Sequence, residues 1–135
     1  MKNDLSLLSS NVTVRELILL GGDIHHIFPK EYLKSKGFEK SQYNQEGNYV
    51  YLDRPVNISI GKKSPKEYFT AAFNQCDTKD IVCGSITDKQ QLLDNMKANC
   101  IPEAIVEMEE DRYQEFLTER RKLMAQKIKD YYYSL

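Results

Sequence analysis

The sequence predicts an α+β fold in which helices dominate and two short strands form a small hairpin-like unit. Two observations predict the strands: residues 23–28 are an apolar run closed by Pro29, and residues 49–52 are rich in strand formers. A third observation, the helical spacing of apolar side chains from Pro102 onward, predicts a helical second half. One helix is expected to cross the hairpin directly after the second strand.

The first 21 residues are expected to form a linker and one short helix. Residues 1–10 are rich in Ser and Asn and are predicted to be frayed or to belong to a linker. Thr13 and Glu16 have the spacing of a capping box, and the glycine pair at 21–22 would end the helix that it opens.

Residues 22–76 are expected to hold both strands and the helices that follow them. Pro29 is at the favoured first position of a short helix over residues 30–36. A polar loop leads to the second strand, a helical turn is predicted from Asp53, and Ser64 with the following proline caps a further helix.

Residues 77–135 are predicted to be a helical extension of the same domain. A loop is expected over residues 77–86, and the spacing of Thr87 and Gln90 predicts the start of a helix that ends near residue 98. A chain of 135 residues can bury one core but not two, which favours a single domain.

Composition excludes several classes of protein. The chain is 41% hydrophobic and 29% charged with a formal net charge of −1, so overall charge gives no support to nucleic-acid binding. The apolar run at residues 17–20 is far too short to span a bilayer, and the first residues lack the features of a signal peptide. We therefore expect a cytoplasmic protein with no membrane association.

The most informative feature is the pair His25-His26, which contains both histidines of the chain. Consecutive side chains of a strand point to opposite faces, so one imidazole could hold a metal while the other reaches a substrate. Phosphodiester hydrolysis needs a divalent ion to neutralise developing charge and a base to take a proton from water. Histidine suits the base role because its reference pKa of about 6.5 leaves a neutral imidazole at cellular pH.

The chain offers a matching set of groups: His26 as the base, with His25 and Asn57 as metal ligands. Asp53 is four residues before Asn57, and the two side chains would share a face if this segment is helical. The alternative role for Asn57 is a helix N-cap, and a histidine pair on its own is more often structural.

Three segments resemble, in order, the motifs of the HNH (His-Me finger, ββα-metal) endonucleases. They are His25-His26-Ile27-Phe28-Pro29, Asn48-Tyr49-Val50-Tyr51-Leu52, and Asn57 with the later Lys63-Ser64-Pro65. The similarity is greatest to the HNH domain at the C-terminal end of GmrSD-type restriction and phage-defence proteins, and it covers about residues 22–76. It implies a ββα-metal core followed by a helical C-terminal half.

The resemblance also implies roles for single residues. His26 matches the general base, His25 the metal ligand before it, and Asn57 the last metal ligand, on the helix. Asn48 matches a residue that pins the loop between the strands and takes no part in the chemistry. Asp53 has no fixed counterpart, although some branches place a ligand four residues before the last one, so it stays a candidate ligand.

Asp23, just before the histidines, is expected to contact a metal ligand rather than the metal itself. The resemblance implies a single Mg²⁺, with Mn²⁺ or another divalent ion as an alternative, and DNA as the substrate. The biological role would be restriction or antiviral defence.

GmrSD-type proteins usually carry a large N-terminal sensor or nucleotide-hydrolysing domain. The chain is therefore either a stand-alone relative or the C-terminal domain of a longer protein, and such a domain or subunit is a possible partner. One active site cuts one strand per event, so double-strand cleavage would need a homodimer or two encounters.

Basic side chains near the motifs could neutralise DNA phosphates or simply face water. The candidates for DNA contact are Lys30, Arg54, Lys62, Lys63 and Lys66. Basic residues of the last helix, among them Arg120 and Lys127, are expected to face water or to extend this surface.

Two other functions remain open from the sequence. The chain could be a non-catalytic DNA-binding or assembly module that keeps the HNH fold as a scaffold. Such a module would not need to bind a metal ion. The chain could also be a nuclease that acts on RNA or as a toxin.

Overall fold

The computed structural model describes residues 4–22 and 24–135, and combines a small two-stranded sheet with a larger number of helices, as expected for the α+β class. The elements are, in chain order, α1 (Val14–Leu19), β1 (Ile24–His26), α2 (Lys30–Ser35), α3 (Lys40–Tyr43), a 3-10 turn η1 (Glu46–Asn48), β2 (Tyr49–Tyr51), α4 (Arg54–Ile60), α5 (Pro65–Thr78), α6 (Lys89–Ala98), the 3-10 turns η2 (Glu103–Glu107) and η3 (Glu110–Arg112), and α7 (Tyr113–Ser134).

The sheet is an antiparallel pair in which His25 lies opposite Val50 and His26 lies opposite Tyr49. The pairing continues one residue beyond β1, where the Ile27 N–H donates to the Asn48 carbonyl oxygen at 2.8 Å. α4 begins within three residues of the end of β2. The strands and α4 therefore follow each other in the predicted order.

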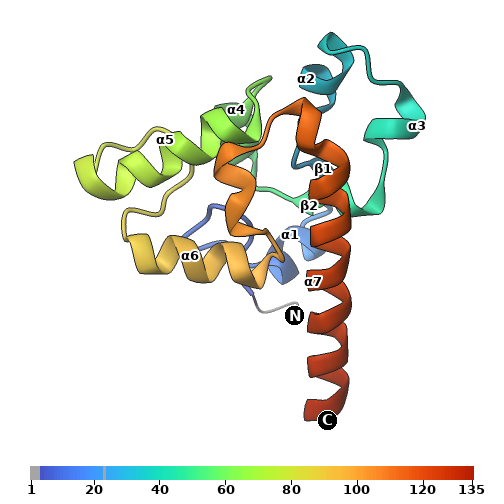
Figure 1. Ribbon diagram of the computed structural model, residues 1–135. Helices are drawn as coiled ribbons and strands as arrows, with labels where there is room; N and C mark the ends of the chain where they lie inside the picture. The colour runs from blue at the N-terminus through green and yellow to red at the C-terminus, as the bar shows by residue number, and fades with distance from the viewer. Residues whose placement is uncertain (1–3, 23) are drawn as a thin grey trace.

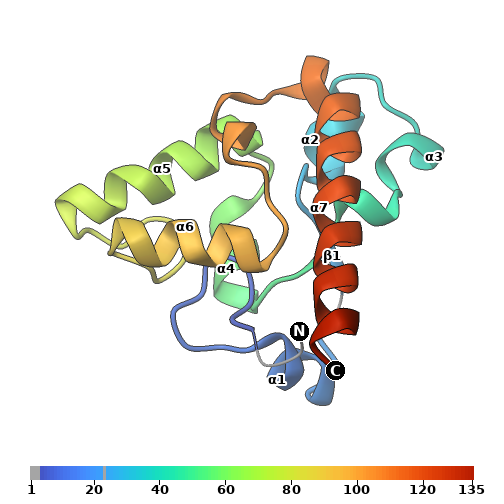
Figure 2. The same cartoon turned by 60° about the horizontal axis from the view of Figure 1, so that its bottom comes forward.

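The helices enclose this sheet from two sides. In Figures 1 and 2, α5 and α6 lie on one side of the molecule, and α7 lies on the other side, next to the strands. The last turns of α7 extend below the other elements in Figure 1, and Tyr132 and Tyr133 at this end are exposed.

The core fixes the backbone that follows the histidines. The Phe28 ring is fully buried and contacts the rings of Tyr113 and Phe116 on α7, with centroids 5.1 and 4.9 Å apart. From α5, the Tyr68 hydroxyl donates to the Ile27 carbonyl oxygen at 2.5 Å. Burial raises the pKa of Tyr68 well above its usual value, so the phenol stays protonated and remains a donor. The backbone directly after β1 is thus held by α5 and α7.

The N-terminal segment differs from the expected linker. Leu7 and Leu8 are fully buried, and the Leu8 N–H donates to the Asn95 side-chain oxygen on α6 at 2.8 Å. The Asn95 amide in turn donates to the Ser6 carbonyl oxygen at 2.9 Å. The prediction was wrong here because the Ser-rich composition hides two leucines that fill the core against α6.

Helix boundaries agree with the capping signals, with four differences. Thr13 caps α1 as predicted, but α6 is capped by Asp88, whose carboxylate accepts from the Gln91 N–H at 2.9 Å, and not by Thr87. Pro29 is the N-cap of α2 rather than its first residue. The segment predicted as a polar loop contains the short helix α3. α5 ends at residue 78, two residues after the expected end of the strand-and-helix core at residue 76.

Two basic residues of α7 do not face water as expected. Arg120 is only 6% exposed, and Lys127 forms an ion pair with Asp4 at 2.5 Å. None of the helices in the described part of the chain has both the length and the apolar composition needed to cross a bilayer.

Candidate functional site

A cavity of about 220 Å³ lies between the end of β1, the start of α2 and one side of α4. Its walls are formed by His25, His26, Pro29, Lys30, Glu31, Asn57, Ile60 and Gly61. Asn57 is 31 positions after His26 in the sequence, and the β1–β2 pairing followed by α4 brings the two residues to one space. The structure therefore brings together both histidines, Asn57 and one of the predicted basic residues, Lys30.

The His26 ring is half-buried and is held on three sides. Its Nε2 lies 2.8 Å from the Asn44 side-chain oxygen, and the rings of Tyr43 and Tyr49 contact it edge-on at centroid distances of 6.0 and 5.4 Å. An amide oxygen only accepts, so Nε2 carries the proton in this hydrogen bond. In the neutral ring, Nδ1 then has the free lone pair.

Asn48 links the two segments that frame His26. It is fully buried, its side-chain oxygen accepts from the Phe28 N–H at 2.8 Å, and its amide donates to the carbonyl oxygens of Phe28 and Tyr43 at 3.1 and 3.2 Å. Tyr43 immediately precedes Asn44, and Phe28 is two residues after His26. Asn48 therefore holds together the backbone on both sides of the His26–Asn44 hydrogen bond.

Asn57 and Asp53 have different positions on α4. Asp53 is the N-cap, with an extended backbone, and its carboxylate accepts from the Val56 N–H at 2.9 Å. Asn57 is the fourth residue of the helix, so it is not the N-cap that was its alternative role. Asp53 lines a separate cavity with Asn11 and Val12. The Asp53 carboxylate is thus used in the helix cap, and Asp53 does not line the cavity that contains Asn57.

Most of the predicted basic residues do not line this cavity. Lys63 and Lys66 line another cavity, where Lys66 lies 3.9 Å from the Glu109 carboxylate. Arg54 and Lys62 are exposed, at the first position of α4 and just after its end. Asp23, the predicted partner of a metal ligand, lies outside the described residues.

Two residues of the site were not found from the sequence. Asn44 lies in a loop, and nothing in its surroundings in the sequence distinguishes it from other polar loop residues. Glu31 lines the cavity from α2 and lies 3.8 Å from Lys34, so it reads from the sequence as half of an ordinary helix-surface ion pair. Only the three-dimensional arrangement places them beside the histidines.

A metal ion at this cavity would depend on few protein ligands. Among the described residues, no three His, Cys, Asp or Glu side chains are grouped so that they could hold an ion together. The cavity does offer an imidazole from His25 and an amide from Asn57, which can both be ligands. The amide oxygen and the small number of protein ligands suit Mg²⁺, which usually keeps several waters, whereas the imidazole suits softer divalent ions such as Zn²⁺.

Comparison of the chain with protein-family models, with curated proteins and with solved structures found no match. The class that fold and site define is a small α+β domain with a histidine pair and an asparagine around one cavity. The proposed function therefore rests on these site residues and on the resemblance of their motifs.

Proposed function

We propose that the chain is a metal-dependent HNH endonuclease domain that hydrolyses DNA phosphodiester bonds with a histidine-activated water, in restriction or phage defence. The observation that carries this proposal is that His25 and His26 of β1 line one cavity with Asn57 of α4, although about 30 residues separate them in the sequence. The DNA substrate and the defence role rest on the resemblance of the motifs to GmrSD-type proteins, as does a possible sensor domain or subunit as a partner.

The order of elements supports the same proposal. A ββα-metal core consists of two antiparallel strands followed by a helix, with the base on the first strand and the last metal ligand on the helix. Here His26 ends β1, β2 pairs with it in antiparallel fashion, and Asn57 lies on α4. The proposal accounts for this order, which a histidine pair with a purely structural role would not require.

His26 would act as the general base through Nδ1. Its Nε2 donates to Asn44, so the ring is oriented and its remaining lone pair is available to take a proton from water. The edge-on contacts with Tyr43 and Tyr49 restrict rotation of the ring. Asn44 is thus a positioning residue in this proposal, because it acts through His26.

His25 and Asn57 would hold a single Mg²⁺ or similar ion. When bound, such an ion supplies positive charge that stabilises the pentacovalent phosphate and the leaving oxygen. Lys30, which also lines the cavity, would bind a neighbouring phosphate of the DNA backbone.

Metal binding tests the proposal against the alternative of a non-catalytic module. The proposal predicts that the protein binds Mn²⁺, measured by loss of the free-ion electron paramagnetic resonance signal. His25→Ala and Asn57→Ala should each weaken binding about tenfold or more. The control Asn74→Ala, at an exposed position of α5, should not change it. Absence of Mn²⁺ binding by the folded protein would favour the non-catalytic alternative.

The substrate is tested by cleavage of end-labelled DNA and RNA duplexes of the same sequence with Mg²⁺. Faster cleavage of DNA supports the proposal, with 5′-phosphate and 3′-hydroxyl ends expected by analogy with the family. A clear preference for RNA would leave the histidine chemistry in place and would contradict the assignment of DNA as the substrate.

A further inference from the structure

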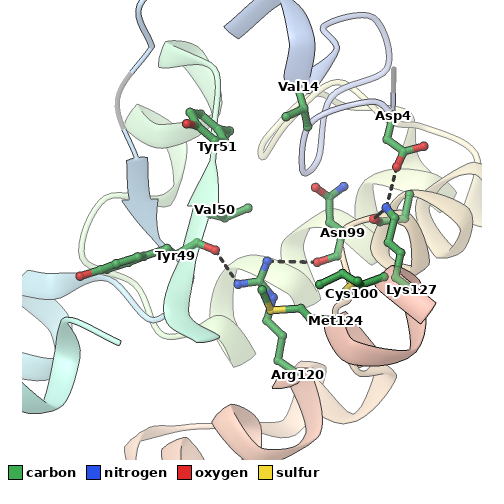
Figure 3. Close-up of a pocket in the computed structure, with 12 residues that line it drawn as sticks. Asp4, Val14, Tyr49, Val50, Tyr51, Asn99, Cys100, Arg120, Met124 and Lys127 are labelled. Carbon is green, nitrogen blue, oxygen red and sulfur yellow. Dashed lines mark hydrogen bonds and ion pairs between the residues drawn. The ribbon is translucent and has the colours of Figure 1, made fainter. Parts of the chain in front are cut away.

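A second cavity, of about 340 Å³, lies between β2, the end of α6 and α7 (Figure 3). Its walls are largely apolar and include Val14, Val50, Met124 and Ile128. Arg120 also lines it, and its guanidinium extends toward β2 and Asn99 in Figure 3. The cavity thus combines apolar walls with a cation that is almost fully buried.

The guanidinium of Arg120 has donors that the protein leaves unused. Three of its N–H groups donate to backbone carbonyl oxygens: two from Nη1 to Gly47 and Tyr49, and one from Nη2 to Asn99. Nε is buried and has no hydrogen-bond partner. A guanidinium has five N–H groups, so Nε–H and one N–H of Nη2 remain. Nε and Nη2 form an edge of the group that binds a carboxylate or phosphate with two parallel hydrogen bonds.

The charge of Arg120 is also not balanced within the protein. No carboxylate of the described residues forms an ion pair with it, and the nearby Lys127 is already paired with Asp4. The cavity therefore contains two cations and one carboxylate. Burial lowers the pKa of Arg120 to about 10, although Cys100 and Tyr68 act to raise it. The guanidinium is therefore still charged at neutral pH. A buried charge without a counter-ion is costly, and an anion would relieve this cost.

We propose that this cavity binds a small molecule that carries a carboxylate or phosphate on an apolar body. Arg120 receives the oxyanion through Nε and Nη2, and the apolar walls contact the body of the molecule. The volume lies in the range of small-molecule sites. Met124, one helical turn after Arg120, has a flexible side chain that can turn away to open the edge. This inference does not depend on the nuclease proposal.

The probes are phenyl phosphate and benzoate, with neutral benzyl alcohol and inorganic phosphate as controls. Binding is followed by nuclear magnetic resonance through the Arg120 Nε–H signal and the Met124 methyl signal of the full chain. We expect one of the two aromatic anions to shift both signals saturably, and at least tenfold more tightly than either control. Comparison of the two anions identifies the preferred oxyanion.

A matched pair of variants at the mouth of the cavity tests the role of charge. Ile128 is 57% exposed, so Ile128→Asp and Ile128→Asn should both leave the fold intact. The carboxylate of Ile128→Asp should weaken binding of the anionic probe at least fivefold more than Ile128→Asn does. Lack of saturable shifts with both aromatic anions would overturn the inference. Equal binding of benzyl alcohol or inorganic phosphate, or equal effects of the two variants, would also overturn it.

Discussion

The Nε2 atom of His26 and the side-chain oxygen of Asn44 lie 2.8 Å apart, and this hydrogen bond leaves Nδ1 as the nitrogen that would be the base in the proposed nuclease. Asn44→Asp should shift the acid limb of the kcat/KM profile to higher pH by about one pH unit, because a carboxylate beside the ring favours the charged imidazolium, which is not a base. Asn44→Ala should lower kcat about tenfold or more through loss of orientation. Both effects are measured as initial cleavage rates over a range of pH.

Asn74→Asp is the matched control for this prediction, since it adds the same charge at an exposed position of α5. Its pH profile should match that of the wild type. An unshifted profile in folded Asn44→Asp would show that Asn44 does not position the proposed base, His26.

Asn48 should matter for stability, because its buried amide makes three hydrogen bonds to the backbone around the site. Asn48→Ala leaves the Phe28 N–H and two carbonyl oxygens without this partner and should lower the free energy of unfolding by about 2–3 kcal/mol. Urea unfolding followed by circular dichroism measures the change. A loss below about 0.5 kcal/mol, similar to that of exposed Asn74→Ala, would contradict this role.

Asp53 is expected to stabilise α4 without binding metal. Asp53→Ala removes the cap on the Val56 N–H and should cost about 1 kcal/mol, whereas Asp53→Asn keeps an accepting oxygen and should cost much less. Neither variant should change the affinity for Mn²⁺ more than about twofold. A large loss of affinity in Asp53→Asn would instead make Asp53 a metal ligand.

Tyr32 and Glu110 join α2 to η3 and should make stability depend on pH. The Tyr32 hydroxyl donates to the Glu110 carboxylate, and this hydrogen bond lowers the pKa of Glu110 below its usual 4.5. A lowered folded-state pKa contributes stability that is present above pH 4.5 and is lost as pH falls through the folded value. The contribution should be below about 1 kcal/mol, because Glu110 is partly exposed.

Urea unfolding of the wild type and Tyr32→Phe at pH 7 and pH 3 measures this contribution. The difference in stability between the two proteins should be smaller at pH 3, because a larger fraction of Glu110 is protonated there than at pH 7. A difference that is the same at both pH values would mean that the hydrogen bond does not depend on the charge of Glu110.

Much of the fold could be predicted because its signals are local. Thr13, Asp53 and Ser64 cap the helices that begin after them, and each accepts a hydrogen bond from the backbone N–H of the third helix residue. The two strands were also predicted from local signals. Pro29 closes the first strand segment, and β-branched and aromatic residues around Val50 favour the second.

The parts that sequence patterns missed depend on contacts between distant residues. Leu7 and Leu8 are buried in the core, and Asn95 on the distant α6 binds the Leu8 N–H and the Ser6 carbonyl oxygen beside them. Arg120 lies on the apolar stripe of α7, three residues after Leu117, but its charge favoured a surface position; its burial depends on the carbonyl oxygens of Gly47 and Tyr49 that accept its hydrogen bonds. Asn44 likewise belongs to the site only because the folded chain brings its side-chain oxygen within 2.8 Å of His26 Nε2.

Nicking of supercoiled plasmid by the purified chain tests most directly whether the cavity lined by His25, His26 and Asn57 cleaves DNA. We expect nicking with Mg²⁺ or Mn²⁺, none with EDTA, and a loss of at least 100-fold in folded His26→Ala. Asn57→Ala should also lose most of the activity, and Asn74→Ala should keep it. Absence of nicking with every divalent ion, or nicking at the wild-type rate in His26→Ala, would contradict the account.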